Sequence, residues 1–203
     1  MHGGRSAAQE ADRQAALAEE LERAACEARQ AASRYRVAAR AEAKTAAVLS
    51  PLAASGYYLL TDRLWPGTRR GNVDLTLVGP GGVFIVDTKA WKEVTISGGR
   101  IYRGEADVTD ELDGLRDLCD LTRADLAEAG LAPGEVRVVV VLAGRRGLRA
   151  HIGEIAVVGE ADVRAFVSGH GTRLPTSLVD AVLRRATTLF REIPGLGVAP
   201  QPA

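Results

Sequence analysis

The sequence predicts an α/β domain, in which helices flank a mixed central sheet, behind a long N-terminal helix. Three observations support this fold class. Residues 7–50 contain neither proline nor glycine and are rich in Ala, Glu, Gln and Arg, which favours a helix. Two β-rich runs flank a turn at residues 79–82, which is typical of a hairpin. A helical pattern then precedes the apolar run 136–142, as expected for a crossover into a buried strand.

The N-terminal helix carries a weak seam with 4-3 spacing. Its positions read Leu, Leu, Ala, Ala, Ala, Tyr, Ala, Glu, Thr, Leu and Leu at residues 17, 21, 24, 28, 31, 35, 38, 42, 45, 49 and 52. Because alanine weakens the seam, we expect no strong coiled coil, and two readings stay open: self-pairing into a homo-oligomer, or packing on the body. We expect a helical arm over residues 1–38, a folded domain over 39–193 and a flexible tail over 194–203.

The other elements follow from hydrophobic periodicity, with Gly and Pro marking their ends. In chain order we expect a strand at 56–63, the central hairpin at 73–78 and 83–88, a second hairpin at 94–97 and 100–102, a helix at 109–129, the buried strand at 136–142, a short strand at 155–158, a helical turn at 162–167 and a last helix at 178–190.

Composition narrows the function classes. The chain has 203 residues, with 26 basic and 26 acidic side chains, and a pI near 6.8, so a strong overall attraction to nucleic acid is not expected, although a local basic rim is allowed. No apolar run approaches the length of a membrane span, and the two cysteines form no CxxC pair. We expect a cytoplasmic protein with reduced thiols and no membrane partner.

The central hairpin gathers acidic residues at its open end. A turn centred between Pro80 and Gly81 pairs residues 78 with 83, 76 with 85, 74 with 87 and 72 with 89, so Asp74 faces Asp87. Opposed like charges destabilise a sheet, and a cation between them would remove that cost. By strand alternation, Asp74, Asp87 and Lys89 share one face, and the opposite face carries Val73, Leu75, Leu77, Phe84 and Val86.

Two carboxylates beside an amine suit phosphodiester hydrolysis. Hard oxygen ligands hold Mg²⁺ while leaving sites for water and phosphate, and an ammonium can orient the water or neutralise charge on phosphorus. Only three of the 26 basic residues are lysines, Lys44, Lys89 and Lys92. A lysine at 89 therefore indicates that a compact ammonium is needed there.

The run from Asn72 to Trp91, with Asp74, the turn, Asp87, Lys89 and Trp91, resembles the nuclease-related domain family, a branch of the restriction-endonuclease-like PD-(D/E)xK superfamily. The resemblance implies a restriction-endonuclease-like core. It also implies that Asp74 and Asp87 bind Mg²⁺ or Mn²⁺ with the backbone carbonyl of Thr88, and that Lys89 is catalytic. A Glu on the preceding helix usually joins them, and Glu42 matches, although Ala41 stands where the family often has Gly.

The position of Glu42 indicates a possible role independently of the family resemblance. It lies on the seam of the N-terminal helix, where a carboxylate is costly unless it is paired or bound to a metal. A site role is one reading. A bond to a neighbouring Arg, or a surface position after a kink, is the other.

Two arginine pairs are candidates for contacts with nucleic acid. Arg69 and Arg70 precede the acidic strand, and Arg145 and Arg146 lie in the most concentrated basic loop of the body. Phosphate groups favour such clusters, but solvated turn residues would look the same. Trp91 is interpreted as a packing residue rather than a platform for a base.

Three functions are compatible with these patterns. The first is a metal-dependent nuclease acting on DNA. The second is an inactive module on the same fold that binds nucleic acid or a protein. In the third, purely structural reading, the helix self-associates and the acids form ion pairs with Arg69 or Arg70.

Overall fold

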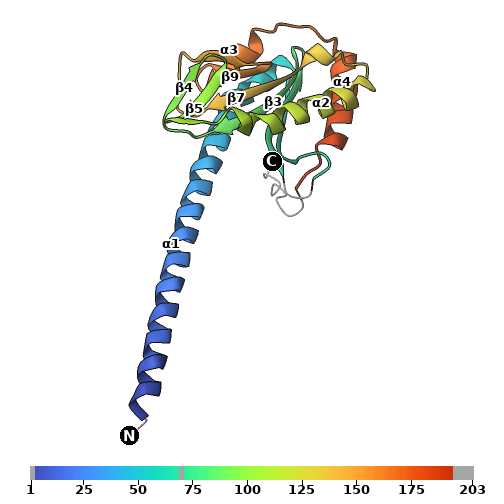
Figure 1. Ribbon diagram of the computed structural model, residues 1–203. Helices are drawn as coiled ribbons and strands as arrows, with labels where there is room; N and C mark the ends of the chain where they lie inside the picture. The colour runs from blue at the N-terminus through green and yellow to red at the C-terminus, as the bar shows by residue number, and fades with distance from the viewer. Residues whose placement is uncertain (1–2, 69–70, 194–203) are drawn as a thin grey trace. The chain divides into compact units, whose positions relative to one another are not determined.

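The computed structural model describes residues 3–68 and 71–193, and it divides into two compact units, Met1–Arg40 and Ala41–Ala203 (Figure 1). The division lies two residues after the predicted end of the arm. The predicted tail, residues 194–203, lies outside the described residues.

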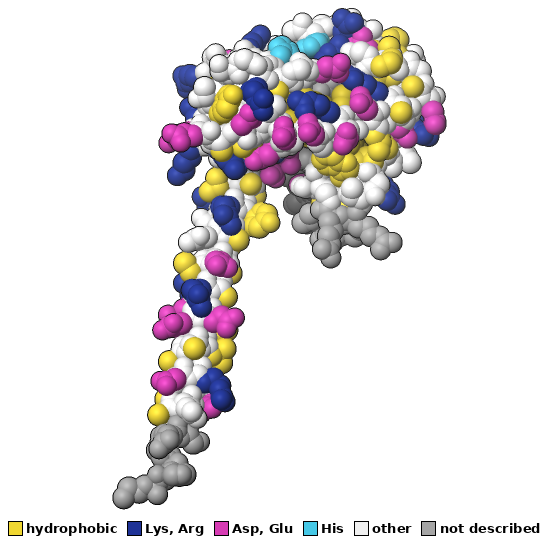
Figure 2. Space-filling model, viewed as in Figure 1, with side chains coloured by type: hydrophobic (Ala, Val, Ile, Leu, Met, Phe, Trp, Pro, Cys, Tyr) yellow, Lys and Arg dark blue, Asp and Glu magenta, His cyan; other side chains and the backbone are white. Residues whose placement is uncertain are grey.

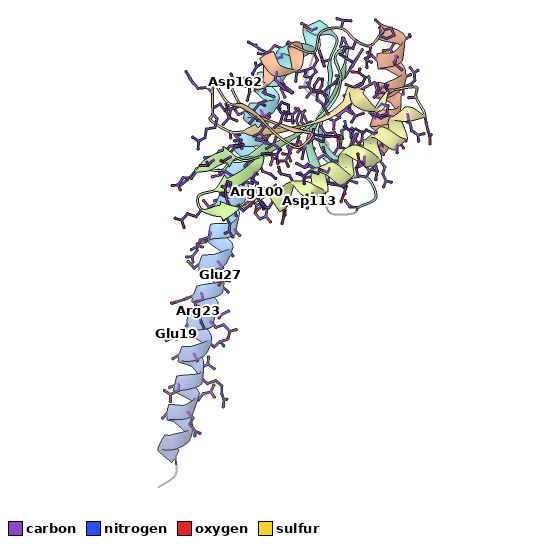
Figure 3. The ribbon with its side chains drawn as sticks, turned by 45° about the horizontal axis from the view of Figure 1, so that its top comes forward. Glu19, Arg23, Glu27, Arg100, Asp113 and Asp162 are labelled. Carbon is purple, nitrogen blue, oxygen red and sulfur yellow. The ribbon has the colours of Figure 1, made fainter. Side chains whose placement is uncertain are left out.

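One helix, α1 (Gly3–Leu49), accounts for the first unit and continues into the second. Glu19, Arg23 and Glu27 follow one another at four-residue spacing along it, which stabilises an exposed helix by side-chain attraction (Figure 3). Pro51 lies in the 3-10 turn η1 (Ser50–Ser55) that follows. Proline has no backbone N–H and its ring clashes with the preceding helical turn, so the α-helix does not continue past this point. Self-association through α1 stays a prediction.

The second unit is built on a mixed six-stranded sheet flanked by helices, which confirms the predicted fold class. Neighbouring strands pair antiparallel, except that β3 with β7 and β7 with β9 pair parallel. In spatial order the strands are β1 (Tyr58–Leu64), β2 (Asn72–Gly79), β3 (Gly82–Lys89), β7 (Val136–Leu142), β9 (Ile155–Gly159) and β8 (Arg149–Ile152).

The predicted hairpin register is confirmed for the pairs Val78–Val83 and Thr76–Ile85, but the recorded ladder ends at Leu75–Val86, so the predicted pairs 74 with 87 and 72 with 89 are not formed. The turn consists of Pro80 and Gly81, and the Gly81 N–H donates to the Tyr57 hydroxyl at 3.1 Å. Gly82 has φ of 120°, and a Cβ there would lie 2.5 Å from the Glu135 carbonyl oxygen. Glycine is therefore required by both conformation and space.

The sheet separates two apolar clusters, so the unit has three layers. One face packs against α2 (Asp113–Ala127) and α4 (Thr176–Leu189), which contact each other. The other face packs against Leu49, η1 and the short helix α3 (Val163–Ser168).

The prediction that side chains alternate strictly between the two faces of the sheet along β2 is wrong at Val73. Val73 packs in the cluster that contains Val78 and Ile85, and not with Leu75. The recorded pairing with β3 stops at Leu75, so Val73 lies beyond the hairpin ladder and is paired with β1 alone. Between Leu75 and Val73 the pairing of β2 with β1 is also interrupted, at Asp62, whose φ is 50°. The strict alternation of side chains is therefore not maintained across this interruption.

A small second sheet and two unpredicted strands complete the unit. The second sheet is formed by β4 (Val94–Ser97), β5 (Arg100–Arg103) and β6 (Ala106–Asp107), and Trp91 packs on the first cluster as expected. The predicted helix at 109–129 begins with the 3-10 turn η2 (Thr109–Leu112), and η3 (Pro133–Glu135) leads into β7. The sequence predicted neither β6 nor β8. None of the described helices is long and apolar enough to cross a membrane.

Candidate functional site

The hairpin ladder ends where the acidic residues begin. The last recorded pair of β2 and β3 is Leu75–Val86. Beyond it, the Thr88 N–H donates to Oδ2 of Asp74 at 2.8 Å, so a carboxylate takes the place of a ladder acceptor. The Ala143 N–H donates to the Lys89 carbonyl at 3.0 Å, which directs that carbonyl towards β7. Because adjacent residues direct their backbone groups to opposite sides of a strand, the Thr88 carbonyl faces the β2 side of β3, as its N–H does.

Asp87 and Lys89 form a partly buried ion pair next to this point. The Lys89 Nζ donates to Oδ1 of Asp87 at 3.2 Å and lies 3.0 Å from Oδ2. Within the described residues, Oδ2 is buried and accepts no well-aligned hydrogen bond. The Lys89 ammonium also lies 5.9 Å from the centre of the Trp91 ring. One carboxylate oxygen is therefore available to a further cation.

Burial and crowded negative charge dominate the electrostatics. Burial, and then the charge of Asp87, raise the pKa of Asp74 to about 7, although the Thr88 N–H and Lys89 oppose the shift. Burial also raises the pKa of Glu42, with further contributions from Asp62 and Asp87 and an opposing one from Lys89. Four carboxylates, those of Asp74, Asp87, Glu42 and Asp62, thus share a region with one ammonium, and a divalent cation would lower the cost of ionising them.

Asp62 is a member of this region that sequence reasoning missed. It lies in β1 between residues paired with Leu75 and Val73, so the register places it opposite Asp74, where the ladder is interrupted. Its φ of 50° is left-handed, a conformation that Asp adopts more readily than most residues. No feature of the sequence marks this break.

The predicted ligands are neighbours, but they are not a preassembled three-carboxylate cage. Among the residues that the structure describes, no group of three or more His, Cys, Asp and Glu side chains is arranged to hold a metal ion. Asp74, Asp87 and the Thr88 carbonyl can nevertheless hold Mg²⁺, because this ion commonly takes one or two carboxylates and keeps several waters. Oδ2 of Asp87 fits this use, because the Lys89 ammonium, 3.0 Å away, is its recorded partner among the described residues and it accepts no well-aligned hydrogen bond there.

Comparison with known families agrees with this geometry. A sequence model described as "Nuclease-related domain" matches residues 38–143, which is more than half of the chain. The chain belongs to the nuclease-related domain family. Glu42, Asp74, Asp87 and Lys89 all lie within the matched part of the nuclease-related domain. No curated protein and no solved structure matches the chain.

The structure describes only one of the two arginine pairs that were predicted to contact nucleic acid. Arg69 and Arg70 lie outside the described residues. The guanidinium of Arg145 donates to the Lys92 carbonyl, which ties the loop after β7 to the segment after β3, while Arg146 is exposed. Both loops follow the carboxyl ends of parallel strands, so this loop lies at the same end of the sheet as Asp87 and Lys89.

The surface charge is mixed rather than basic. On the face shown in Figure 2, acidic and basic side chains are interspersed over the second unit. This agrees with the zero net charge of the chain. Any contact with nucleic acid therefore depends on local groups and not on a broad positive field.

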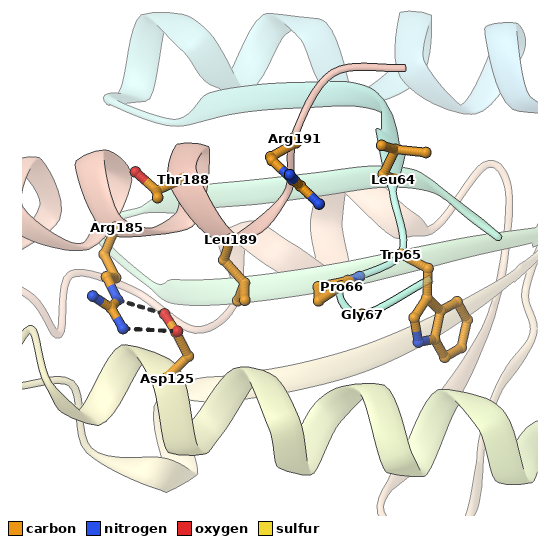
Figure 4. A pocket seen from close by; sticks show the side chains of 9 residues that line it. All are labelled: Leu64, Trp65, Pro66, Gly67, Asp125, Arg185, Thr188, Leu189 and Arg191. Carbon is orange, nitrogen blue, oxygen red and sulfur yellow. Dashed lines mark hydrogen bonds and ion pairs between the residues drawn. The ribbon is translucent and has the colours of Figure 1, made fainter. Parts of the chain in front are cut away.

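A cavity of about 230 Å³ lies apart from the candidate site, and none of Glu42, Asp62, Asp74 and Asp87 lines it (Figure 4). It lies between the loop after β1 and the helices α2 and α4, with Trp65 and Leu189 in its wall. The Arg185 guanidinium bonds both carboxylate oxygens of Asp125, at 2.6 and 2.9 Å, and so closes one side. The described lining contains none of the predicted site residues.

Proposed function

We propose that this nuclease-related domain is a metal-dependent nuclease that hydrolyses phosphodiester bonds in DNA with Mg²⁺ or Mn²⁺. The observation that carries the proposal is the open end of the hairpin. There the Thr88 N–H binds the Asp74 side chain instead of the β2 backbone, and Asp87 keeps one buried oxygen whose recorded partner among the described residues is the Lys89 ammonium alone, at 3.0 Å. An acidic group with its pKa raised to about 7 gains from a cation.

The acids would hold the ion, and Lys89 would act on the substrate. Asp74, Asp87 and the Thr88 carbonyl offer three oxygens, and Glu42 is the fourth candidate. A divalent ion held there would supply Lewis-acid stabilisation and a bound water of lowered pKa. The Lys89 ammonium has three N–H donors, one of which is directed at Asp87. Its other donors can orient the attacking water or stabilise negative charge on the phosphoryl oxygens.

The test is cleavage of plasmid, linear and single-stranded DNA with Mg²⁺ and with Mn²⁺. We expect cleavage by the parent protein and its loss in Asp87→Ala and Lys89→Ala, both of which should stay folded. The exposed carboxylate of Asp117 on α2 provides a matched control, and Asp117→Ala should cleave like the parent. Undiminished activity in either site variant would remove these residues from the mechanism.

The second candidate is an inactive module that binds nucleic acid or a protein partner. The absence of a ready three-ligand group among the described residues favours it. Calorimetric titration with Mg²⁺ separates the two, because an inert scaffold would give no binding that depends on Asp74 and Asp87.

The proposal also includes a cytoplasmic location and self-association through α1. Within the described residues, Cys26 is exposed, Cys119 is buried, and neither forms a disulfide. This supports a reducing, cytoplasmic location. Self-association through α1 is tested by sedimentation of the full chain over a range of concentrations.

A further inference from the structure

Glu160 is a buried acid that the proposed reaction leaves unused. It directly follows β9 and is 5% exposed. A buried carboxylate is costly unless it is paired and hydrogen-bonded. A buried acid at the end of a central strand therefore calls for an explanation in its contacts.

The two carboxylate oxygens of Glu160 bind two different elements. Oε2 accepts a hydrogen bond from the Gly144 N–H at 3.1 Å, in the loop after β7. Oε1 lies 2.5 Å from the Nζ of Lys44, in the part of α1 that belongs to the second unit. The backbone N–H of Glu160 also donates to the Leu142 carbonyl at 3.1 Å. One side chain thus links the end of α1 to the carboxyl end of the sheet.

This link reaches the candidate site from both sides. Lys44 lies two residues after Glu42 on α1, and the next residue, Thr45, is buried. On the other side, Gly144 follows Ala143, whose N–H binds the Lys89 carbonyl. A chain of bonded groups therefore runs from Lys89 through Glu160 to the helix that carries Glu42.

The same segment fixes the basic loop. The Ala161 N–H donates to the Arg145 carbonyl at 3.1 Å. The Leu148 N–H donates to Oδ2 of Asp162 at 3.4 Å, and Figure 3 labels Asp162 next to this end of the sheet. Glu160 and its neighbours therefore hold the loop backbone in one conformation while Arg146 stays exposed.

We propose that Glu160 is a positioning residue, which sets Glu42 and the Arg145–Arg146 loop relative to the metal-binding acids. This inference rests on the proposed nuclease function. The recorded side-chain partners of Glu160 are Lys44 and the Gly144 N–H, so on this proposal it acts through them and not as a ligand. Partners that bond a metal ligand directly contribute typically about 10–100-fold in metal affinity, and because Glu160 is one step further from the ligands we expect the lower end of that range.

The variant Glu160→Gln isolates the charge, because the amide oxygen can still accept the Gly144 N–H. We expect the dissociation constant for Mg²⁺, measured by calorimetry on the full chain, to rise by about tenfold. Glu154→Gln is the matched control, because Glu154 is an exposed acid paired with Arg123, and its Mg²⁺ affinity should not change. Lys44 has a side chain that is 63% exposed, so Lys44→Gln should keep the fold and reproduce the effect, and Lys44→Arg should restore affinity.

A double variant separates positioning from general stability. If Glu160 acts through Glu42, then Glu160→Gln should weaken Mg²⁺ binding no further in a Glu42→Gln background. Effects that add, or parental Mg²⁺ affinity in folded Glu160→Gln and Lys44→Gln, would overturn the positioning role alone. A parent protein that binds no Mg²⁺ would overturn the nuclease proposal, and this inference with it.

Discussion

Replacing Asp74 by Asn should stabilise the metal-free protein near neutral pH. The folded side chain keeps its proton up to about pH 7, because burial and the charge of Asp87 raise its pKa, whereas the ordinary value is 3.8. The folded state therefore binds more protons between these values, and its stability falls as pH rises through this window. Asn cannot ionise, yet its amide oxygen can still accept the Thr88 N–H that Asp74 binds at 2.8 Å.

The size of the effect follows from the shift. A change from 3.8 to about 7, at about 1.4 kcal/mol per unit, gives an upper bound of about 4 kcal/mol for the ionised side chain. Water near this partly exposed acid screens the charge, and burying an Asn amide has its own desolvation cost. We therefore expect Asp74→Asn to gain about 1–3 kcal/mol at about pH 8 and little at about pH 4.

The assay is urea unfolding in EDTA across this pH range, repeated with Mg²⁺. Asp117→Asn, which removes an exposed acid of α2, is the control and should follow the parent. Mg²⁺ should stabilise the parent at about pH 8 and have almost no effect on Asp74→Asn, because binding to the folded state alone raises stability. An Asp74→Asn protein that is less stable than the parent at about pH 8 in EDTA would refute the electrostatic reasoning.

Three further predictions concern the site and its frame. Lys89→Arg should keep the fold and the charge but reduce cleavage by about 100-fold, since a planar guanidinium cannot replace the compact ammonium; steady-state kinetics checks this. Gly82→Ala should cost more than about 2 kcal/mol in urea unfolding, because a Cβ would lie 2.5 Å from the Glu135 carbonyl oxygen, whereas Gly98→Ala, with open space around it, should cost about 1 kcal/mol. Hydrogen bonds from Arg173 and Arg137 lower the pKa of Glu135, so its stabilising effect is present at neutral pH and is lost as pH falls through that lowered pKa; Glu135→Gln should therefore lower the melting temperature at pH 7 and have no effect in strong acid.

The sequence was most informative where one local rule decides the structure. The hairpin register followed from the turn at Pro80 and Gly81, and the apolar run of β7, interrupted only by Arg137, identified a strand buried on both faces. The strand β8 could not be recognised, because Arg149 and His151 point to solvent on this edge strand and leave only two apolar residues. Non-polar periodicity is too short there to predict a strand.

Other parts of the site depend on contacts distant in sequence. The left-handed conformation of Asp62 interrupts a ladder that the residue itself does not specify. Glu160 and Lys44 form an ion pair although they are 116 positions apart in the chain, and the sequence near either residue does not predict this pair. The acids Asp74 and Asp87 were predictable as neighbours because a hairpin brings them together. Glu42 was predicted at the site only through the family resemblance and its position on the helix seam, since bringing it near the two acids requires the fold of the whole second unit.

The open end of the hairpin explains how one arrangement can be unfavourable for the apo fold and useful for binding. Strand pairing would normally satisfy the Thr88 backbone, and the Asp74 carboxylate replaces that pairing at the cost of being held among other negative charges. Lys89 is bonded to Asp87 and compensates for only part of this charge. A divalent ion would add the missing positive charge without changing the backbone that presents the ligands. If the proposed ion binds there, it would remove the electrostatic cost that this negative charge imposes on the metal-free fold.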